Sequence, residues 1–544
     1  MPRIRIHDFL IISYDISPGD RYWTALSTHL MALYGNETVT DHAQVEAILI
    51  DSFKFLCKEF REEIKKETSF KFFQYIFFLH EQSIQLYKLV LGGAKLNTVD
   101  EDEFAMYRRV LKNILEQGCD NDLFWGDMPN PDEMLQIDEK VQDLLYLGTW
   151  IYAFADMIAF QKMVDRCHWI QFKHGNLLSI DWQYHYGQLY HSLFPQLRTD
   201  YERGTFDLQA FQKLKTAIEE CFQIEYGFAA SQIFDIKKHH SDLDSQTIQP
   251  HILAENLVLA YGISEESAKD FYNGLTLGRV NKMALEDLVY KPYSLNRHMY
   301  RPILIYHIGG EDRALVGYQK FNESIVTLAT NAMHWNVLPK EWLNNRCMQL
   351  FMNKMSREHD KILEDEVQKV LESEHLLFVR NIKSFKQPNG NNVNIDNQTA
   401  GEIDFIILNG KLKKIFVADS KYNRARYETV GFRNDLANFV SDYEPKLAKK
   451  LNWVKGNVQL VQNHFRIIYN QRDLNLEGFS VEGVFFINTP TFYMFNGNYN
   501  AITLNSLRSF ITGRFENKKF IYLNKDPNAD NMYDIIEHPY FKQK

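Results

Sequence analysis

The chain has 544 residues, of which 45% are hydrophobic and 24% charged, and its formal net charge is −9. This length predicts more than one domain, and a composition without repeats or low-complexity tracts excludes a largely disordered or fibrous protein. From Glu341 to the end, 28 Lys and Arg face 24 Asp and Glu, which leaves 33 against 46 for residues 1–340. Because phosphate binding depends on clustered cations, the C-terminal part is the better candidate for a nucleic-acid surface.

The sequence predicts a cytoplasmic protein without a membrane partner. The N-terminus lacks the long apolar core and cleavage site of a secretory signal. The longest apolar run, residues 144–160, contains Gly148 and Asp156, which favours a buried helix over a membrane span. The five cysteines have no close neighbours in the sequence, so we expect reduced thiols and neither a disulfide framework nor a zinc ribbon. They are Cys57, Cys119, Cys167, Cys221 and Cys347.

Residues 1–245 have the pattern of a mainly helical domain. Amphipathic, aromatic-rich segments fill residues 43–91, the acids at 100–103 suit the positive end of a helix dipole, and Pro131 favours another helix start. Helical spacing and negative charge favour core packing of the aromatic residues over base stacking. We expect this domain to recognise a substrate feature or to bind a protein partner.

The next part, residues 246–345, is predicted to be an α+β connecting section. Its landmark is a hairpin over residues 301–319 that turns at Gly309 and Gly310. Turn geometry explains these glycines, and no phosphate loop is needed. The remaining part, residues 346–544, carries the residues that suggest chemistry.

A pair of apolar strands is predicted between Gly401 and Tyr422, in the sequence GEIDFIILNGKLKKIFVADSKY. Unpaired carboxylates are costly in a sheet core, so acids near strand ends suggest a site for a divalent cation. Successive strand side chains alternate between faces, which places Asp419 and Lys421 on one face. In a hairpin with an even-numbered loop, Asp404 lies on that face too.

The hairpin register decides whether the two aspartates can share an ion. A two-residue turn at Asn409-Gly410 would separate their carboxylates by roughly 13 Å, at about 3.3 Å per residue, which is too far. A loop spanning Asn409 to Leu412 makes them diagonal, and a turn at Lys411-Leu412 makes them opposite. We expect the wider loop, from Asn409 to Leu412.

These residues resemble the PD-(D/E)XK, or restriction-endonuclease-like, nuclease superfamily. The family pattern is an acid on one strand and acid-x-lysine on the next, here Ile403-Asp404 followed by Asp419-Ser420-Lys421. Two positions depart from it: Ile403 replaces proline, and Asp419 stands where glutamate is commoner. The resemblance implies an α+β protein whose C-terminal domain is an α/β restriction-endonuclease-like fold with a mixed central sheet.

The family also expects a helix with a glutamate ahead of the strands. Residues 361–374 have helical apolar spacing, and Glu364 precedes Val367 as in the family's glutamate-x-x-valine pattern. Glu366 is the alternative. Elements then follow in the order helix, strand, strand, strand, helix, strand, the last strand covering residues 481–487.

The resemblance implies a magnesium site, with Mn²⁺ as a substitute. Asp404, Asp419, Glu364 and the backbone carbonyl of Ser420 would be its ligands, and Lys421 would orient the attacking water. Gln462 and His464, on the predicted helix 459–469, are candidates for a supporting role. Six basic residues after the strands are candidates for binding the nucleic-acid backbone, although the lysines suit a solvated helix face equally well: Arg424, Arg426, Arg433, Lys446, Lys449 and Lys450.

The expected function is therefore Mg²⁺-dependent endonuclease activity on DNA, by family analogy in bacterial restriction or anti-phage defence. The chain has no GxxxxGK[ST], GxSxG or HExxH motif. This argues against a P-loop ATPase, an α/β-hydrolase with a serine nucleophile and a zinc protease of the HExxH type. Two alternatives stay open: an inactive nucleic-acid-binding or assembly protein with this fold, and a scaffold whose strand acids form structural ion pairs. A homodimer would allow both DNA strands to be cut.

Overall fold

The protein is an α+β protein, and contacts divide its chain into two compact units. The first comprises residues 1–158, 168–181 and 205–356, and the second comprises residues 159–167, 182–204 and 357–544. The boundary predicted at residue 245 lies outside the residues that the structure describes. The computed structural model describes residues 3–13, 20–35, 37–96, 99–127, 129–163, 168–173, 177–182, 208–239, 247–335, 337–395, 399–424, 426, 428–515, 520–523 and 533–536.

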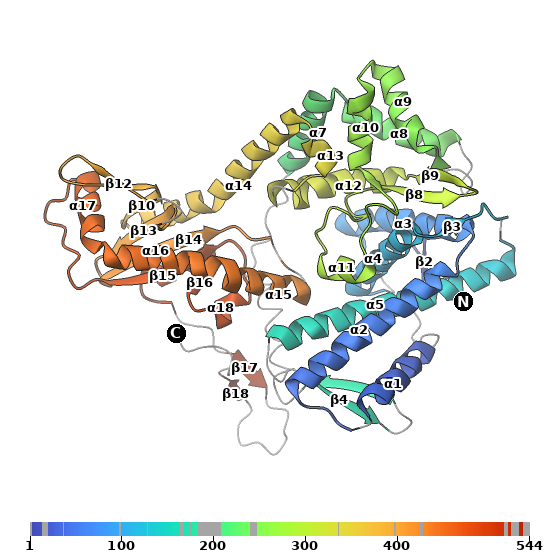
Figure 1. Ribbon diagram of the computed structural model, residues 1–544, viewed down its shortest axis with the longest axis horizontal. Helices are drawn as coiled ribbons and strands as arrows, with labels where there is room; N and C mark the ends of the chain where they lie inside the picture. Colours follow the sequence, from blue (N-terminus) through green and yellow to red (C-terminus); the bar gives the residue numbers. More distant parts are fainter. Residues whose placement is uncertain are drawn as a thin grey trace. The chain divides into compact units, whose positions relative to one another are not determined.

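Two helices of the first unit, α4 and α5, begin where the sequence signals predicted (Figure 1). Asp100 caps α4, and together with Glu103 it forms a capping box that satisfies backbone amides at the helix start. Pro131 is the first residue of α5. The helices lying wholly or mostly in this unit are α1 (Asp20–Tyr34), α2 (His42–Lys65), α3 (Phe70–Leu91), α4 (Glu101–Gly118), α5 (Pro131–Met163), α7 (Leu208–Phe222), α8 (Tyr226–His239), α9 (Pro250–Tyr261), α10 (Glu265–Gly274), α11 (Leu285–Tyr290), α12 (Tyr318–Asn331), η2 (Met333–Trp335) and α13 (Lys340–Leu343).

Helix α5 contains the longest apolar run. Among the described residues it is the one helix long and apolar enough to cross a membrane, and 61% of its most apolar window is buried inside the protein. That burial agrees with the prediction of a core helix, which passes the same test of length and composition.

Five strands in the described part of the first unit form a small mixed sheet in the order β3-β8-β9-β6, with β7 also paired to β8, while β1 with β2 and β4 with β5 form separate two-stranded sheets. The predicted hairpin is confirmed as β8 and β9, and its turn residues Gly309 and Gly310 both have positive φ, of 62° and 87°. The strands are β1 (Arg3–Ile6), β2 (Phe9–Ile12), β3 (Asp122–Leu123), β4 (His168–Lys173), β5 (Leu177–Trp182), β6 (Thr247–Ile248), β7 (Thr276–Leu277), β8 (Ile303–Ile308) and β9 (Glu311–Leu315).

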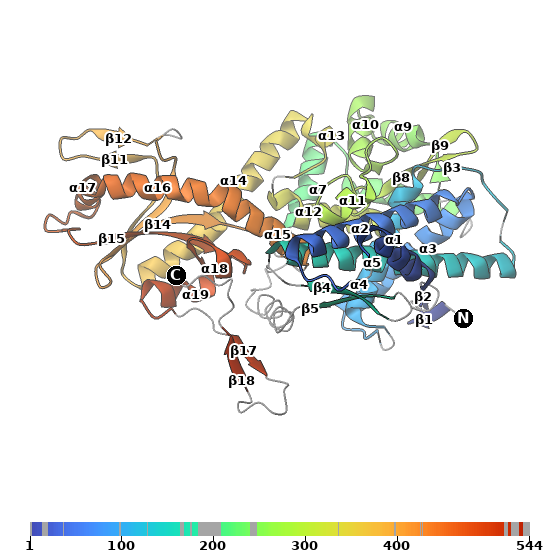
Figure 2. The same cartoon turned by 60° about the horizontal axis from the view of Figure 1, so that its bottom comes forward.

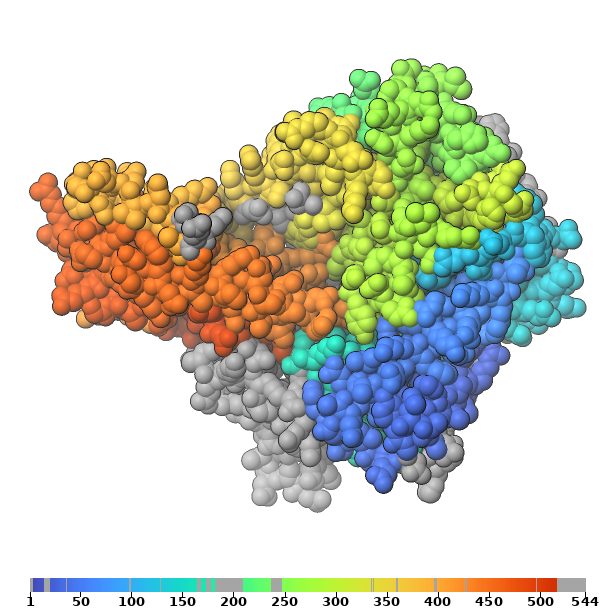
Figure 3. Space-filling model, in the orientation of Figure 1, coloured from blue at the N-terminus to red at the C-terminus, as the bar shows by residue number. Residues whose placement is uncertain are grey.

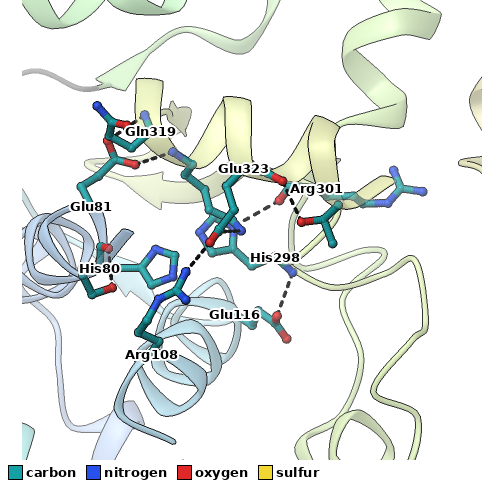
Figure 4. A network of polar contacts seen from close by, with 11 residues as sticks. His80, Glu81, Arg108, Glu116, His298, Arg301, Gln319 and Glu323 are labelled. Carbon is teal, nitrogen blue, oxygen red and sulfur yellow. Dashed lines mark hydrogen bonds and ion pairs between the residues drawn. The ribbon is translucent and has the colours of Figure 1, made fainter. Parts of the chain in front are cut away.

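A buried polar network joins α3, α4 and α12 in the core of this unit (Figure 4). The Glu81 carboxylate accepts hydrogen bonds from the backbone amides of Gln319 (3.1 Å) and Lys320 (2.7 Å), and so caps the start of α12. The Lys320 ammonium, which is fully buried, donates to Glu323 at 2.7 Å, and Arg108 also binds Glu323. Each of these charges therefore has an opposite charge or backbone amides against it.

Cys221, in the last turn of α7, and Cys347 form a disulfide with their Cα atoms 5.3 Å apart. The prediction of unpaired cysteines is wrong for these two residues, because their separation of 126 positions gives no sequence signal. Cys57 and Cys119 are buried free thiols, and Cys167 lies outside the described residues.

Helix α14 (Arg346–Ser373) begins in the first unit and ends in the second, so the predicted start of the C-terminal part at residue 346 coincides with the start of this helix. The second unit is built on a five-stranded mixed sheet in the order β10-β13-β14-β15-β16. Strand β13 is antiparallel to both of its neighbours, β10 and β14, whereas β14, β15 and β16 run parallel to one another. The other elements are β10 (Leu377–Ile382), β11 (Ser384–Lys386), β12 (Asn392–Asn394), β13 (Ile403–Asn409), β14 (Lys414–Lys421), α15 (Thr429–Asn438), the π-helical turn η3 (Phe439–Tyr443), α16 (Glu444–Gly456), α17 (Val458–Tyr469), β15 (Ser480–Ile487), α18 (Tyr493–Asn496), β16 (Asn500–Thr503), α19 (Leu504–Ile511), β17 (Phe520–Leu523) and β18 (Tyr533–Ile536).

Each face of the five-stranded sheet packs against its own helices (Figure 2). On one face, Ile406, Leu408, Ile415 and Val417 of β13 and β14 join a core with residues of α16 and α17. The alternate strand residues pack on the other face with α14 and α19. We call these the α16 face and the α14 face.

The β13–β14 hairpin has a four-residue loop, from Gly410 to Lys413, with Asn409 paired to Lys414. The predicted loop has the right length but the wrong position, because it starts one residue later than expected. Asn409 is kept in the strand by its side chain, which donates to the carbonyl of Ile511 at 2.5 Å and accepts from the amide of Leu412 at 3.0 Å. The shift changes the relation of the two aspartates from diagonal to directly opposite.

Candidate functional site

The predicted acid–acid–lysine set lies together at one end of the β13–β14 pair. The last paired residues, Phe405 and Ala418, put Asp404 and Asp419 at the next opposed position. Both aspartates and Lys421 share strand parity with the residues of the α16 face, such as Ile406 and Val417. The predicted parity is therefore confirmed by the register.

Asp404 is held by the neighbouring strand. Its Oδ2 accepts a hydrogen bond of 2.7 Å from the backbone amide of Ser420, beyond the last paired residues of the ladder. Its other oxygen, Oδ1, lies 3.7 Å from the ammonium of Lys450 on α16. One oxygen is thus fixed by the sheet, and the other points towards the helix.

Asp419 lies between two lysines and is almost fully buried, with 2% of its side chain exposed. Lys450 Nζ donates to Oδ1 at 2.9 Å, and Lys421 Nζ forms an ion pair with Oδ2 at the same distance. Among the described residues, Oδ2 meets no donor at hydrogen-bond geometry, although it is ion-paired with Lys421. The four side chains make a cluster of two carboxylates and two ammonium groups.

The surroundings of the two carboxyl groups shift their pKa values in opposite directions. Burial, and then the negative charge of Asp419, raise the pKa of Asp404 to about 8. Burial also acts to raise the pKa of Asp419, but Lys421 and Lys450 outweigh it and hold that pKa below its usual range. Asp419 is therefore the charged member of the pair at neutral pH.

Lys421 is positioned by its surroundings and keeps its charge. Burial acts to lower its pKa, but Asp419 and Asp404 outweigh this effect and raise it. Its ammonium lies over the ring of Tyr443, 4.9 Å from the ring centre. Tyr443 belongs to the π-helical turn η3, a kind of irregularity that is frequent at functional sites.

The donor set fits a hard divalent cation. Two opposed carboxylates, one with a buried oxygen that accepts no hydrogen bond from the described residues, are oxygen donors of the kind that Mg²⁺ prefers, and Mg²⁺ commonly takes one or two carboxylates with water and substrate oxygens as the rest. Among the described residues, no group of three or more His, Cys, Asp or Glu side chains could hold a metal ion. The site is therefore an aspartate pair without a third acidic ligand.

The structure does not bring Glu364 to this pair. Its carboxylate forms an ion pair with Arg380 of β10 at 3.1 Å, and Arg380 lies opposite Phe405, on the α14 face of the sheet. Glu366 forms an exposed pair with Lys369 on the same helix. The α14 residues next to Glu364 pack on the face opposite the aspartates, so a ligand role for either glutamate stays a prediction.

Of the three arginines predicted to bind nucleic acid, Arg433 lies in α15, and Arg424 and Arg426 lie in the segment before it. Arg426 makes a bidentate ion pair with Asp435, at 3.0 and 2.7 Å, and both side chains are largely buried. The positive charge of Arg424 also acts on Asp435, and Arg433 donates to Asn434 at 3.0 Å. Arg426 therefore holds the connection to α15 in place, and its guanidinium is already occupied.

The three predicted lysines of α16 separate into two kinds. Lys446 and Lys449 are exposed on the helix surface, which Figure 3 shows in orange, and Lys446 pairs with Asp442. Lys450 is buried and belongs to the aspartate cluster. A sequence signal could have found this difference, because Lys450 lies at helical spacing from the buried Leu447 and Val454.

Gln462 and His464 each accept a hydrogen bond from a backbone amide of another segment of the second unit. Gln462 accepts from the amide of Leu476 at 2.8 Å, and His464 Nδ1 accepts from the amide of Lys386 at 2.9 Å. Burial lowers the pKa of His464 to about 4, so its ring is neutral at physiological pH.

Comparisons of this chain with protein-family models, with curated proteins and with solved structures found no match. The chain's own residues and the geometry of the aspartate cluster are therefore the basis for assigning a function.

Proposed function

We propose that the second unit is a metal-dependent nuclease that hydrolyses phosphodiester bonds, with DNA as the expected substrate. The observation that carries the proposal is the placement of Asp404 opposite Asp419 at the end of two apolar strands. Two opposed carboxyl groups in a poorly hydrated place cannot both be ionised without a cost in free energy, and a divalent cation bound between them would offset that cost. The acid, acid and lysine order of the nuclease resemblance falls on the same residues.

In this proposal each side chain has a distinct task. Asp404 and Asp419 hold the divalent cation, with Asp404 kept in orientation by the Ser420 amide. Lys421, fixed between Asp419 and the Tyr443 ring, donates to a phosphate oxygen or to the attacking water. Bound Mg²⁺ would lower the pKa of that water and neutralise charge on the phosphate.

The test is a cleavage assay with plasmid, linear, single-stranded and RNA substrates in Mg²⁺, Mn²⁺ or EDTA. We expect cleavage that EDTA abolishes and that Asp419→Asn or Lys421→Met reduces at least about 100-fold. Asp419→Asn removes a charged ligand of the metal, and Lys421→Met removes a positive charge beside the reacting phosphate. Lys455→Met, at an exposed position of α16, is the matched control. Nucleic-acid binding without cleavage under every condition would favour the inactive binding protein instead.

A further inference from the structure

The buried ammonium of Lys450 lies where a cation shared by the two aspartates would interact with both. It is 2.9 Å from Asp419 Oδ1 and 3.7 Å from Asp404 Oδ1, and 10% of its side chain is exposed. The other lysine of the cluster, Lys421, contacts the opposite oxygen of Asp419. Lys450 therefore bridges the pair, whereas Lys421 lies to one side of it.

We propose that Lys450 is an internal counter-ion that competes with the divalent metal and leaves the aspartates when the metal binds. The proposal rests on the proposed function, because it concerns the same two carboxylates. An ammonium group and a divalent cation are both attracted to the Oδ1 atoms of the two aspartates. Two positive charges in that position repel each other. In the metal-free protein, the ammonium of Lys450 thus occupies the position of the divalent metal ion.

Once displaced from the aspartates, the ammonium of Lys450 requires another anion, and a phosphate bound beside the metal supplies one. Lysine carries its charge on a flexible four-carbon stem, so a small rotation can exchange a carboxylate for a nearby anion. Metal and phosphodiester binding are then coupled, since each removes the obstacle to the other. Lys450 is in this view a positioning residue that limits metal loading until nucleic acid is present.

The first test is the affinity of the full chain for Mn²⁺ without nucleic acid, measured by titration calorimetry. Lys450→Met should bind Mn²⁺ about tenfold more tightly than the wild type, while Lys455→Met binds as the wild type does. Asp419→Asn should abolish this binding in both backgrounds. An unchanged or weaker affinity in Lys450→Met would overturn the proposal.

The second test uses the wild-type protein and does not depend on a variant that folds. Lysine acylation at limiting reagent, read by mass spectrometry, should show Lys450 protected without metal and several-fold more reactive with saturating Mn²⁺. Lys455, exposed on the same helix, should react equally in both states. Equal protection of Lys450 with Mn²⁺ bound at the aspartates contradicts displacement.

The cleavage assay separates this proposal from the nuclease proposal. If Lys450→Met binds Mn²⁺ more tightly and no substrate is cut by any form, the counter-ion role stands and the nuclease activity fails. If the wild type cuts DNA but neither metal affinity nor Lys450 reactivity changes as stated, the nuclease stands and the counter-ion role fails.

Discussion

Both units bury charged side chains between helices and strands, but they arrange the charges differently. In the first unit, Glu323 receives Lys320 and Arg108, and Glu81 receives two backbone amides (Figure 4). In the second unit, two carboxylates oppose each other. Ion pairs between opposite charges are sufficient to explain the first network as structure, whereas two opposed carboxyl groups with pKa values shifted in opposite directions are characteristic of a binding or catalytic site.

The comparison predicts the largest stability loss in the first unit. Glu323→Gln leaves the fully buried Lys320 ammonium without its carboxylate, so we expect the free energy of unfolding of this unit to fall by about 3–5 kcal/mol. Denaturant unfolding, followed by hydrogen exchange of α12 peptides, measures the change. The thermal shift on adding Mn²⁺ should survive this substitution and vanish in Asp419→Asn. A Glu323→Gln loss below about 1 kcal/mol would contradict a structural role for the network.

A pH effect should be visible in the second unit. The pKa of His464 is about 4 when folded, against an ordinary value of 6.5, so between these values the unfolded chain binds a proton that the folded chain does not. Stability present at pH 7 is therefore lost as the pH falls from 6.5 towards 4, by about 1–2 kcal/mol after allowance for solvent screening. Hydrogen exchange of α17 at pH 7 and pH 4.5, with correction for the intrinsic rate, should show this loss reduced in His464→Gln.

The cap of α12 should have a smaller effect than its ion pairs. Glu81→Gln keeps one acceptor for the amides of Gln319 and Lys320 but removes the charge that interacts with the helix dipole. We expect destabilisation of about 1 kcal/mol, measured by chemical denaturation of the first unit. A loss as large as that of Glu323→Gln would show that the negative charge matters more here than the ordering of the helix start.

The smallest effect on stability is expected at the exposed lysine of α16. Lys446→Met breaks only a surface pair with Asp442, so the free energy of unfolding should change by about 0.5 kcal/mol or less. If Lys446 contacts a phosphate, the slope of log affinity against log salt should fall by about one. An unchanged slope removes it from the nucleic-acid surface.

Much of the second unit could be predicted from the sequence, because its signals are local. Apolar runs located β13 and β14, helical spacing located the C-terminal half of α14, and parity placed Asp404 with Asp419. The remaining features depend on contacts between distant segments. The loop was misplaced by one residue because Asn409 binds Ile511, which is 102 positions away.

The roles of two charged residues also depend on contact partners that a local pattern does not identify. Glu364 satisfied the family's spacing, but its partner Arg380 comes from the adjoining strand and lies on the α14 face. Helical spacing from Leu447 and Val454 indicates that Lys450 is buried, but it does not indicate which side chains Lys450 contacts. Only the packing of α16 against the sheet directs its amine to the aspartates.

The hydrogen bond from the Ser420 amide to Asp404 gives the site a built-in spectroscopic reporter. The same carboxylate that would bind an ion also satisfies a backbone group at the end of β14. Any change in the charge or rotamer of Asp404 is therefore transmitted to the electronic environment of one amide. The resonance of Ser420 should consequently reveal whether the pair is occupied, even when no substrate has been identified.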